Sequence, residues 1–194
     1  MSRVIVLHAP PPGHASPEWE RGLLQRLPYA RRLELESRDA QSRRASLGGT
    51  ALLLEAAGRL GYGDVGSSEL RFPEDAKPRI AGGPYFSISH TARRVACAAS
   101  RECDIGLDHE DYAGVEALAR LKRWTAIEAT LKAAGAGLRR ADAVEVDAEL
   151  SCSRLDGAEY SLVALDFGPG IVACLAAGSR PDAIEIQRLA GVAP

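Results

Sequence analysis

Lysine is scarce in this chain, and the patterns that mark several classes of protein are missing from it. Lysine occurs only at Lys77, Lys122 and Lys132, so arginine supplies most of the positive charge. The formal net charge of -2 gives no reason to expect nucleic-acid binding. No charged segment is followed by a long apolar run and no stretch of about 18 apolar residues occurs, so we expect neither a secretory signal nor a membrane span. These absences predict a cytoplasmic protein that binds neither nucleic acid nor membrane.

The four cysteines show no spacing that is typical of a metal site or a redox motif. They form no Cys-x-x-Cys pair and do not group with histidines. Cys97 and Cys174 lie within apolar runs, so we interpret them as small buried residues in a reducing compartment. With 194 residues, 46% of them hydrophobic, the chain can build a core for one or two small domains.

The most informative stretch of the sequence is 85–110. Its first part alternates apolar and hydroxyl side chains, which predicts a strand that carries Ser89 on one face and ends at His90. The apolar run 95–99 predicts a buried return strand, and 105–110 predicts a third strand.

Two carboxylates stand two positions apart on the third predicted strand. Asp108 and Glu110 therefore project from one face, while Leu107 and His109 point to the other. Close carboxylates repel each other unless a cation lies between them, and Mg²⁺ prefers oxygen ligands, usually with one or two carboxylates among them. The alternative is a solvated acidic strand end, which is the commoner meaning of a bare Asp-x-Glu.

A second segment adds an acid and a base at helical spacing. In a helix, Trp124, Glu128 and Lys132 follow at i, i+4 and i+8 and form one stripe. The glycines from 135 onward are typical of the end of a helix. Taken alone, Glu128 and Lys132 also fit an ordinary surface ion pair worth roughly 0.3 kcal/mol.

Three pieces of sequence together resemble the 4'-phosphopantetheinyl transferases of the surfactin-synthetase-activating type. They are Phe-Ser-Ile-Ser-His-Thr at 86–91, Gly-Leu-Asp-His-Glu at 106–110, and Trp-Thr-Ala-Ile-Glu-Ala-Thr-Leu-Lys-Ala-Ala-Gly-Ala-Gly-Leu at 124–138. Upstream, Ala76-Lys77-Pro78 stands where that family has Gly-Lys-Pro. Each piece is short, and it is their order along 77–138 that carries the resemblance.

The resemblance implies an α/β (α+β) fold of the pseudodimeric type, with two similar α/β halves. The N-terminal half would be 1–104, with the coenzyme A segment, and the C-terminal half 105–194, with the metal site and the Trp-Thr-x-x-Glu-Ala helix. The sequence also resembles itself, because 85–99 and 160–177 each join an aromatic-led strand to a Val-Ala-Cys strand. This internal repeat agrees with the implied architecture.

The same resemblance implies an enzyme that transfers the 4'-phosphopantetheine arm of coenzyme A to a serine of an acyl or peptidyl carrier protein. Adenosine 3',5'-bisphosphate is the second product. The implied cofactor is Mg²⁺, held by Asp108, Glu110 and Glu128. By resemblance Glu128 is also the catalytic base, and Lys132 holds the pyrophosphate of coenzyme A and stabilises the leaving charge.

Further contacts to coenzyme A follow from the resemblance. Ser89 and His90 match a pair that contacts phosphate, and Lys77 matches its upstream partner. Arg44 ends an Arg-Arg pair before a helix, as in the family, which suggests another phosphate contact. Thr50 stands where the family has an arginine in that helix.

The chain also departs from the family in three places. Ser87 replaces an asparagine, and Ile127 replaces the lysine before the glutamate. On a helix, Ile127 points about 100° away from Glu128, so we expect the metal site to form. Only 111–123 separates the acidic strand from the helix, where longer members carry an insertion that contributes to carrier docking.

These departures leave two alternatives open. The first is a catalytically impaired, transferase-like protein that binds coenzyme A or a carrier protein. The second is an unrelated structural α/β domain.

Other segments have ordinary secondary-structure signals. We expect a strand over 2–9 and a helix that begins with Ser16 as N-cap and Pro17 in its first turn. The remaining expectations are a helix over 46–60, a short strand over 70–72, a strand over 143–150, a hairpin of 161–167 with 171–177, and a terminal extension with a short helix over 183–189.

Overall fold

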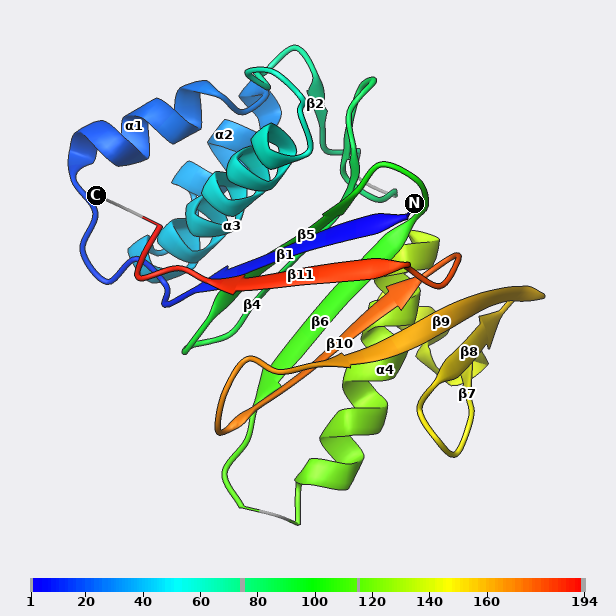
Figure 1. The fold of residues 1–194 in the computed structure, drawn as a ribbon. Coiled ribbons are helices and arrows are strands. Elements are labelled where there is room, and N and C mark those ends of the chain that lie inside the picture. The colour runs from blue at the N-terminus through cyan, green and yellow to red at the C-terminus, as the bar shows by residue number, and fades with distance from the viewer. Residues whose placement is uncertain (1, 74–75, 115, 193–194) are drawn as a thin grey trace.

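The computed structural model describes residues 2–73, 76–114 and 116–192 and shows a mixed α/β fold in four layers. Two β-sheets pack face to face, with helices on the outer face of each (Figure 1). The helices are α1 (Pro17–Gln25), α2 (Tyr29–Glu36), α3 (Ala40–Arg59) and α4 (Leu118–Ala134), followed by a 3-10 helix at Leu138–Ala143. None of these helices is both long enough and apolar enough to cross a membrane.

The first sheet has the strand order β11-β1-β5-β4, and the second has the order β6-β10-β9-β8-β7. A small ribbon of β2 and β3 stands apart from both. The strands are β1 (Arg3–Ala9), β2 (Leu70–Arg71), β3 (Arg79–Ile80), β4 (Tyr85–His90), β5 (Val95–Ser100), β6 (Ile105–Asp111), β7 (Glu145–Val146), β8 (Cys152–Leu155), β9 (Ala158–Leu165), β10 (Ile171–Ala177) and β11 (Ala183–Arg188). β1 and β11 run parallel, and the other paired strands are antiparallel.

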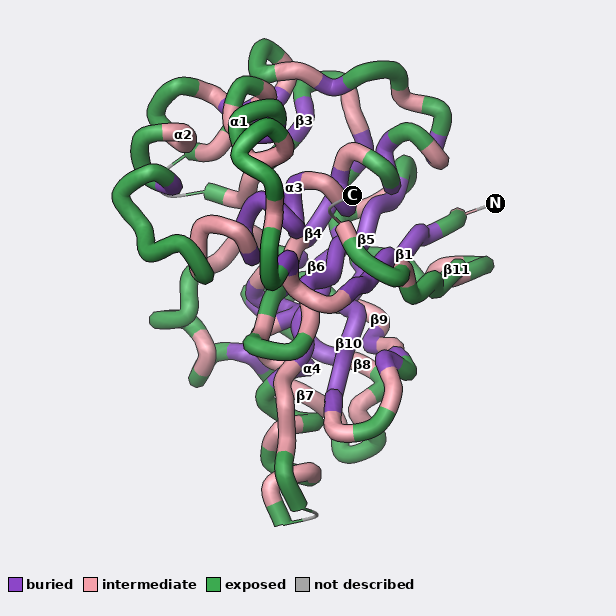
Figure 2. Tube along the Cα trace, turned by 90° about the vertical axis from the view of Figure 1, so that its left-hand side faces the viewer, coloured by how far each residue is buried: buried purple, intermediate pink, exposed green. Residues whose placement is uncertain are grey.

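The central strands are buried on both faces, which explains their unbroken apolar sequences. In β1, Ile5 and Leu7 pack toward α3, while Val4 and Val6 pack toward the second sheet. Figure 2 shows the buried backbone concentrated in these central strands, with exposed residues on the surrounding helices and loops.

β6 uses the same alternation to bring α4 against the second sheet. Leu107 joins the core between the sheets, so Gly106 and Asp108 face α4. A Cβ atom on Gly106 would overlap the carbonyl oxygen of Ala129 and the amide nitrogen of Ala133. The missing side chain therefore allows the backbones of β6 and α4 to lie in direct contact.

Most of the expected elements are confirmed. The strand over 2–9, the three strands within 85–110 and the hairpin of β9 and β10 form as predicted. Ser16 caps α1 by accepting a hydrogen bond from the Trp19 amide at 3.2 Å. α4 ends at Gly135, which has the left-handed conformation expected of a C-terminal glycine, with φ of 68°.

The helix expected over 183–189 is wrong, because this segment forms strand β11. Its residues pair in parallel with β1 from Arg3 to His8. Ile184 packs against the core between the sheets, and alternation along the strand leaves Glu185 exposed. The free edge of β1 offers a full row of backbone partners, which a short polar helix could not match.

Smaller differences lie in both parts of the chain. The strand expected over 143–150 is reduced to β7, which pairs with β8, and the chain then turns through Leu150, whose φ is 54°. The helix α2 and the strand β8 were not expected, because the sequence carries no clear helix or strand signal over their residues. Because β11 returns to the first sheet, residues on both sides of the predicted boundary at 104/105 share one sheet, and that boundary stays a prediction.

Candidate metal centre and phosphate site

The candidate site lies where the edge strand of the first sheet meets the edge strand of the second. β4 and β6 are each the last strand in their sheet, and two serine hydroxyls connect them. Ser87 Oγ accepts a hydrogen bond from the Leu107 amide at 2.9 Å, and Ser89 Oγ donates to Asp108 Oδ1 at 3.1 Å. Ser87 and Ser89 therefore bind the two strands together.

Three carboxylates converge at this junction. Asp108 and Glu110 come from β6 and Glu128 from α4, and each offers an oxygen so that all three atoms lie within 4.8 Å of one another. Asp108 is 2% exposed, and the other two are half-buried. The two-residue spacing on β6 and the close contact of α4 at Gly106 together produce this cluster.

The three carboxyl groups have raised pKa values. Burial is the main cause for each, and the negative charge of Asp108 raises the pKa values of Glu110 and Glu128 further. The positive charge of Lys132 acts in the opposite direction and offsets part of the rise in all three pKa values. The repulsion among the carboxylates is thus offset only in part by the single lysine beside them.

One oxygen of Asp108 fits a further ligand. Asp108 Oδ2 is buried and has no hydrogen-bond partner among the residues that the structure describes. An unpaired carboxylate oxygen in that environment is costly unless a cation lies beside it. Together with Glu110 and Glu128, this oxygen gives an all-oxygen ligand set that suits Mg²⁺.

Lys132 is the cation that the protein itself supplies to the cluster. Its Nζ donates to Asp108 Oδ1 at 2.5 Å and to Ser89 Oγ at 3.5 Å, and lies 3.9 Å from Glu128 Oε2. Its side chain is 32% exposed, so the amine also reaches solvent. The predicted stripe of Glu128 and Lys132 therefore faces β6.

His90 ends β4 as predicted and is exposed, close to several cations. Desolvation of the ring and the positive charges of Lys132, Arg38 and Arg31 lower its pKa. Both arginines pair with Glu34 at 2.5 Å. Neither was predicted as a site residue; the only signal was the arginine-rich segment 31–44, which does not show which of its members turn toward β4.

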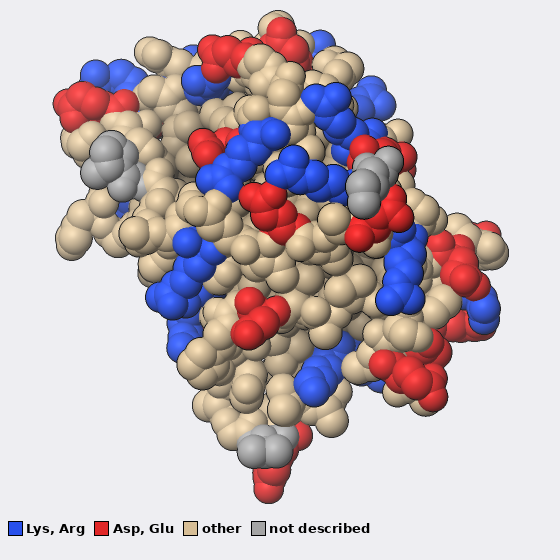
Figure 3. Space-filling model, in the orientation of Figure 1, with Lys and Arg blue, Asp and Glu red and all other residues tan. Residues whose placement is uncertain are grey.

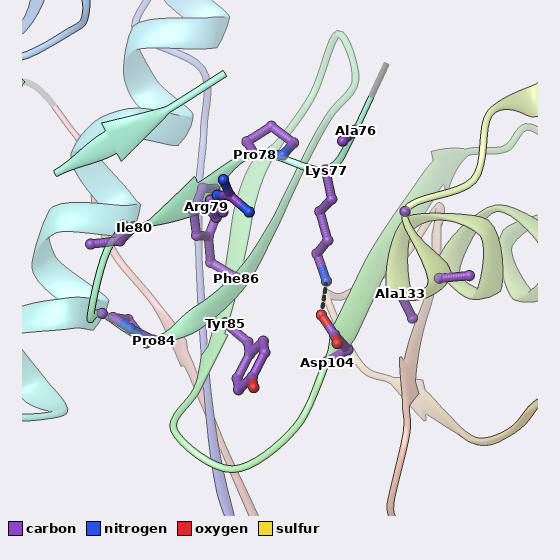
Figure 4. Close-up of a pocket in the computed structure, with 13 residues that line it drawn as sticks. Ala76, Lys77, Pro78, Arg79, Ile80, Pro84, Tyr85, Phe86, Asp104 and Ala133 are labelled. Atoms are coloured by element: carbon purple, nitrogen blue, oxygen red, sulfur yellow. Dashed lines mark hydrogen bonds and ion pairs between the residues drawn. The ribbon is translucent and has the colours of Figure 1, made fainter. Parts of the chain in front are cut away.

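Lys77 lines a separate cavity of about 460 Å³ at the start of β6. Its Nζ donates to Asp104 Oδ1 at 3.2 Å and to the carbonyl oxygen of Ile105 at 2.7 Å. Figure 4 shows this contact to Asp104, with Tyr85 and Pro84 on one side of the cavity and Ala133 on the other. Burial lowers the pKa of Lys77. Among the described residues, Lys77 makes no hydrogen bond to the three carboxylates.

Arg44 forms no ion pair with the three carboxylates in the described ranges. It lies in α3, and its Nε is buried without a hydrogen-bond partner among the described residues. Thr50, in the same helix, is buried and donates to the carbonyl oxygen of Ser46 at 3.1 Å. A long charged side chain at position 50 would need to leave this packed face.

Ile127 points away from the carboxylates, as its helical position predicts. It packs against a small cluster formed by Leu131, Val144 and Leu155 beneath α4. The Ile127 side chain therefore fills an apolar contact and does not disturb the three carboxylates on the other face of α4.

Comparison with known proteins adds no identification. No family model matches the chain, and no curated protein matches it.

Proposed function

We propose that this protein is a 4'-phosphopantetheinyl transferase of the surfactin-synthetase-activating type. The observation that carries the proposal is the convergence of Asp108, Glu110 and Glu128, together with one buried oxygen of Asp108 that has no hydrogen-bond partner in the part of the chain that the structure describes. Lys132 and Ser89 lie at the same junction, in hydrogen-bond contact with Asp108. Five residues from three motifs thus meet in one place, although 39 positions separate Ser89 from Glu128.

The proposed reaction is attack by a carrier serine on the phosphorus next to the pantetheine arm. A new bond forms between the serine oxygen and this phosphorus, and the bond to the bridging oxygen of the pyrophosphate breaks. Adenosine 3',5'-bisphosphate leaves with the electron pair, and the serine proton moves to a base. The demands on the protein are alignment, neutralisation of phosphate charge and removal of that proton.

The residues present supply each of these functions. Asp108, Glu110 and Glu128 would hold Mg²⁺, which when bound neutralises the pyrophosphate oxygens. Glu128 reaches this junction from α4 and is the candidate base for the serine proton. Lys132, partly exposed beside the carboxylates, is placed to bind the pyrophosphate.

The pseudodimeric architecture is part of the proposal. The hairpins β4–β5 and β9–β10 are both antiparallel, and each contains a Val-Ala-Cys strand. Each sheet also carries a helix on its outer face, α3 on the first and α4 on the second. These matched parts support a fold of two related halves.

A binding protein without transferase activity is the second candidate. Ile127, in place of the lysine expected from the resemblance, and the short connection 111–123 favour it. In that case the protein would bind coenzyme A or a carrier protein and leave both unchanged.

Intact-mass analysis of carrier proteins tests the proposal. Several apo acyl and peptidyl carrier proteins are incubated with the protein, coenzyme A and Mg²⁺, and a matched sample contains EDTA. The expected result is a carrier heavier by one phosphopantetheine, and no change with EDTA. Coenzyme A binding without any mass gain would favour the second candidate, and absence of both would reject the proposal.

A further inference from the structure

Strand β11 leaves one long edge of the first sheet open. Among the residues that the structure describes it pairs with β1 alone, and every residue in it except Ile184 is exposed. Figure 2 shows β11 as the outer margin of this sheet, at the right of the view. An open strand edge presents a row of N–H and C=O groups to which another strand can bind.

The other outer strands of the two sheets are protected. β4 and β6 lie against each other and are joined through Ser87 and Ser89, and β7 has only two residues. β11 has six residues, pairs with β1 without a bulge, and contains neither proline nor lysine. Since proteins commonly block an edge with short strands, bulges, prolines or lysines, β11 is the place where a further strand fits.

The hydrogen bonds to β1 decide which backbone groups of β11 face outward. The amide of Leu189, directly after β11, donates to the carbonyl oxygen of His8 at 2.8 Å, so the odd-numbered residues direct their backbone groups toward β1. These directions alternate along a strand. The backbone groups that point to the open edge are therefore those of Ile184, Ile186 and Arg188.

The two faces of β11 differ in how their side chains are engaged. Glu185 and Gln187 both contact Arg59 of α3. On the opposite face Ile186 is 40% exposed, and Arg188 is exposed and belongs to no ion pair within 2–73, 76–114 and 116–192. An exposed apolar side chain and a cation thus stand beside the open backbone edge.

A second copy of the chain fits this edge in one register. Two copies related by a two-fold axis perpendicular to the sheet pair antiparallel, and the two registers with the longest overlap place the axis at Glu185 or at Ile186. An axis at Glu185 sets two identical carboxylates directly opposite each other, which is unfavourable. With the axis at Ile186 the two isoleucines cover each other, Glu185 lies opposite Gln187, and the outward backbone groups of both strands pair.

Charge complementarity supports the same register. Arg188 stands diagonal to Asp182 of the second copy, at a separation of about 7–8 Å that a long side chain can bridge. Glu185, on the other face, is balanced within its own chain by Arg3 and Arg59. Charges of both signs are interspersed on the face shown in Figure 3, and the net charge of -2 is small, so long-range repulsion between copies is weak.

We propose that β11 is a homodimer interface, at which two copies of this chain join their first sheets antiparallel about a two-fold axis at Ile186. The assembly closes at two copies, because each copy uses this edge for the other. A pair of six-residue strands buries less than the roughly 1,200 Å² of a standard interface, so the dimer is weak and forms with rising concentration. β11 and β4 are the opposite edges of the first sheet, so the dimer leaves both candidate metal centres open. The inference does not depend on the transferase function.

Two lysine substitutions at neighbouring positions test the interface. Ile186→Lys sets two like charges directly opposite each other at the axis. Gln187→Lys is the matched control, because it makes the same change in net charge but sets the lysine opposite Glu185 of the second copy. Both positions are exposed and lie outside the candidate metal centre. The molecular mass is measured by analytical ultracentrifugation over about 1–300 µM, a range that suits a weak interface.

Wild type should rise from the 20.6 kDa of one chain toward twice that mass as its concentration increases. Ile186→Lys should have a Kd for dimerisation at least about tenfold higher than wild type, because like charges replace an apolar contact. Gln187→Lys should dimerise within about threefold of wild type or more tightly. The Tm of each variant in dilute solution checks that the fold is retained.

Hydrogen exchange in wild type locates the interface even if a variant does not fold. The amides of Ile184, Ile186 and Arg188 should become protected only at high protein concentration. The amide of Glu185, which faces β1, should be protected at every concentration.

Several outcomes would overturn the proposal. They are a wild type that keeps the mass of one chain throughout, assembly beyond two copies, and an Ile186→Lys variant that dimerises like wild type. A dimer in which the outward amides stay unprotected would place the interface elsewhere. None of these outcomes bears on transfer to a carrier protein, so the test of the proposed function stands apart.

Discussion

Asp108 is the residue in which the demands of folding and of metal binding conflict most directly. It is almost fully buried, it lies beside two other carboxylates, and one of its oxygens is unpaired within the described chain. Burial of such a charge costs stability, and the cost is reduced only in part by the contact with Lys132. The residue therefore makes sense as a ligand more than as a structural ion pair.

Replacement of this charge should separate stability from metal binding. In EDTA, Asp108→Asn should be at least as stable as wild type, because the amide keeps an acceptor for Lys132 and removes the repulsion with Glu110 and Glu128. Mg²⁺ should raise the Tm of wild type, by about 3 °C for each kcal/mol of binding energy, and should not raise that of the variant. Thermal unfolding with Mg²⁺ or EDTA measures both effects.

Transfer activity of the Asp108→Asn variant completes this test. We expect loss of Mg²⁺-dependent transfer while the folded structure is retained. A variant that still responds to Mg²⁺ in Tm and turns over like wild type would remove Asp108 from the ligand set.

Lys132 should show a different pattern, because it is both counterion and candidate phosphate ligand. With saturating Mg²⁺, Lys132→Ala should lower kcat by about 10²-fold, since a positive charge beside the developing phosphate charge is lost. In EDTA the variant should lose about 2 kcal/mol of stability, because Asp108 is left without its cation. Steady-state kinetics and urea unfolding with and without Mg²⁺ measure the two effects.

Lys132→Arg is the matched control for this substitution. It keeps the positive charge and should restore the stability in EDTA, but the larger guanidinium should recover only part of kcat. An unchanged kcat in Lys132→Ala would contradict its proposed role at the pyrophosphate.

At the scale of elements, the contact between β6 and α4 decides whether the site exists. Asp108 and Glu110 lie on the strand and Glu128 and Lys132 on the helix, so the separation of the two elements sets the distances within the cluster. Gly106 is the position of closest approach, because a side chain there would meet the backbone of Ala129 and Ala133. The glycine of the Gly-Leu-Asp-His-Glu piece therefore has a packing role rather than a conformational one.

Gly106→Ala should damage fold and site together. We expect a loss of about 3 kcal/mol in the free energy of unfolding, since helix backbone must move to admit the methyl group. The Mg²⁺-dependent rise in Tm should also shrink, because Glu128 moves away from β6. Gly58→Ala is the control: nothing lies within 4 Å of its Cβ position near the end of α3, and the change should stabilise the helix by up to about 1 kcal/mol. Equal stability of Gly106→Ala and wild type would show that the two elements are not in tight contact.

Elements with a local signal were predictable from sequence, and elements that depend on distant partners were not. The Ser16 cap, the alternation in β4 and the glycine end of α4 are set by residues within one or two turns. β11 is different, because its state depends on the free edge of β1, about 180 residues earlier in the chain. The same limit applies to Arg31 in α2 and to Arg38 just after it, whose charges lower the pKa of His90 on a distant strand.

At the scale of the whole molecule, the two sheets enclose polar side chains between them. His8 from β1 is 3% exposed and stacks on Phe167, with ring centroids 4.2 Å apart. His109 from β6 meets the Phe167 ring edge-on, with ring centroids 5.6 Å apart. Nδ1 of each histidine is buried without a partner among the described residues. Both rings are thus suited to the neutral form only.

This arrangement predicts a loss of stability in mild acid. Burial, followed by the charges of Arg94 and Arg188, lowers the pKa of His8 from 6.5 to about 4. Below pH 6.5 the unfolded chain therefore binds a proton that the folded chain does not, and stability falls as the pH decreases toward about 4. The contribution of His8 amounts to about 2 kcal/mol between pH 7 and pH 5. Urea unfolding at these two pH values measures the difference.

The carboxyl groups of Asp108, Glu110 and Glu128 have the opposite effect on stability. Their raised pKa values let the folded state take up protons before the unfolded state does, so they favour folding as the pH falls. A comparison of variants is therefore needed to isolate His8. His8→Leu has no imidazole to protonate at this position. Between pH 7 and pH 5 its free energy of unfolding should therefore fall by about 2 kcal/mol less than that of wild type. His14→Gln, at an exposed loop position, should keep the pH dependence of wild type. If His8→Leu instead kept the full dependence, protonation elsewhere would control acid stability, and the packing of the two sheets around His8 would not be its cause.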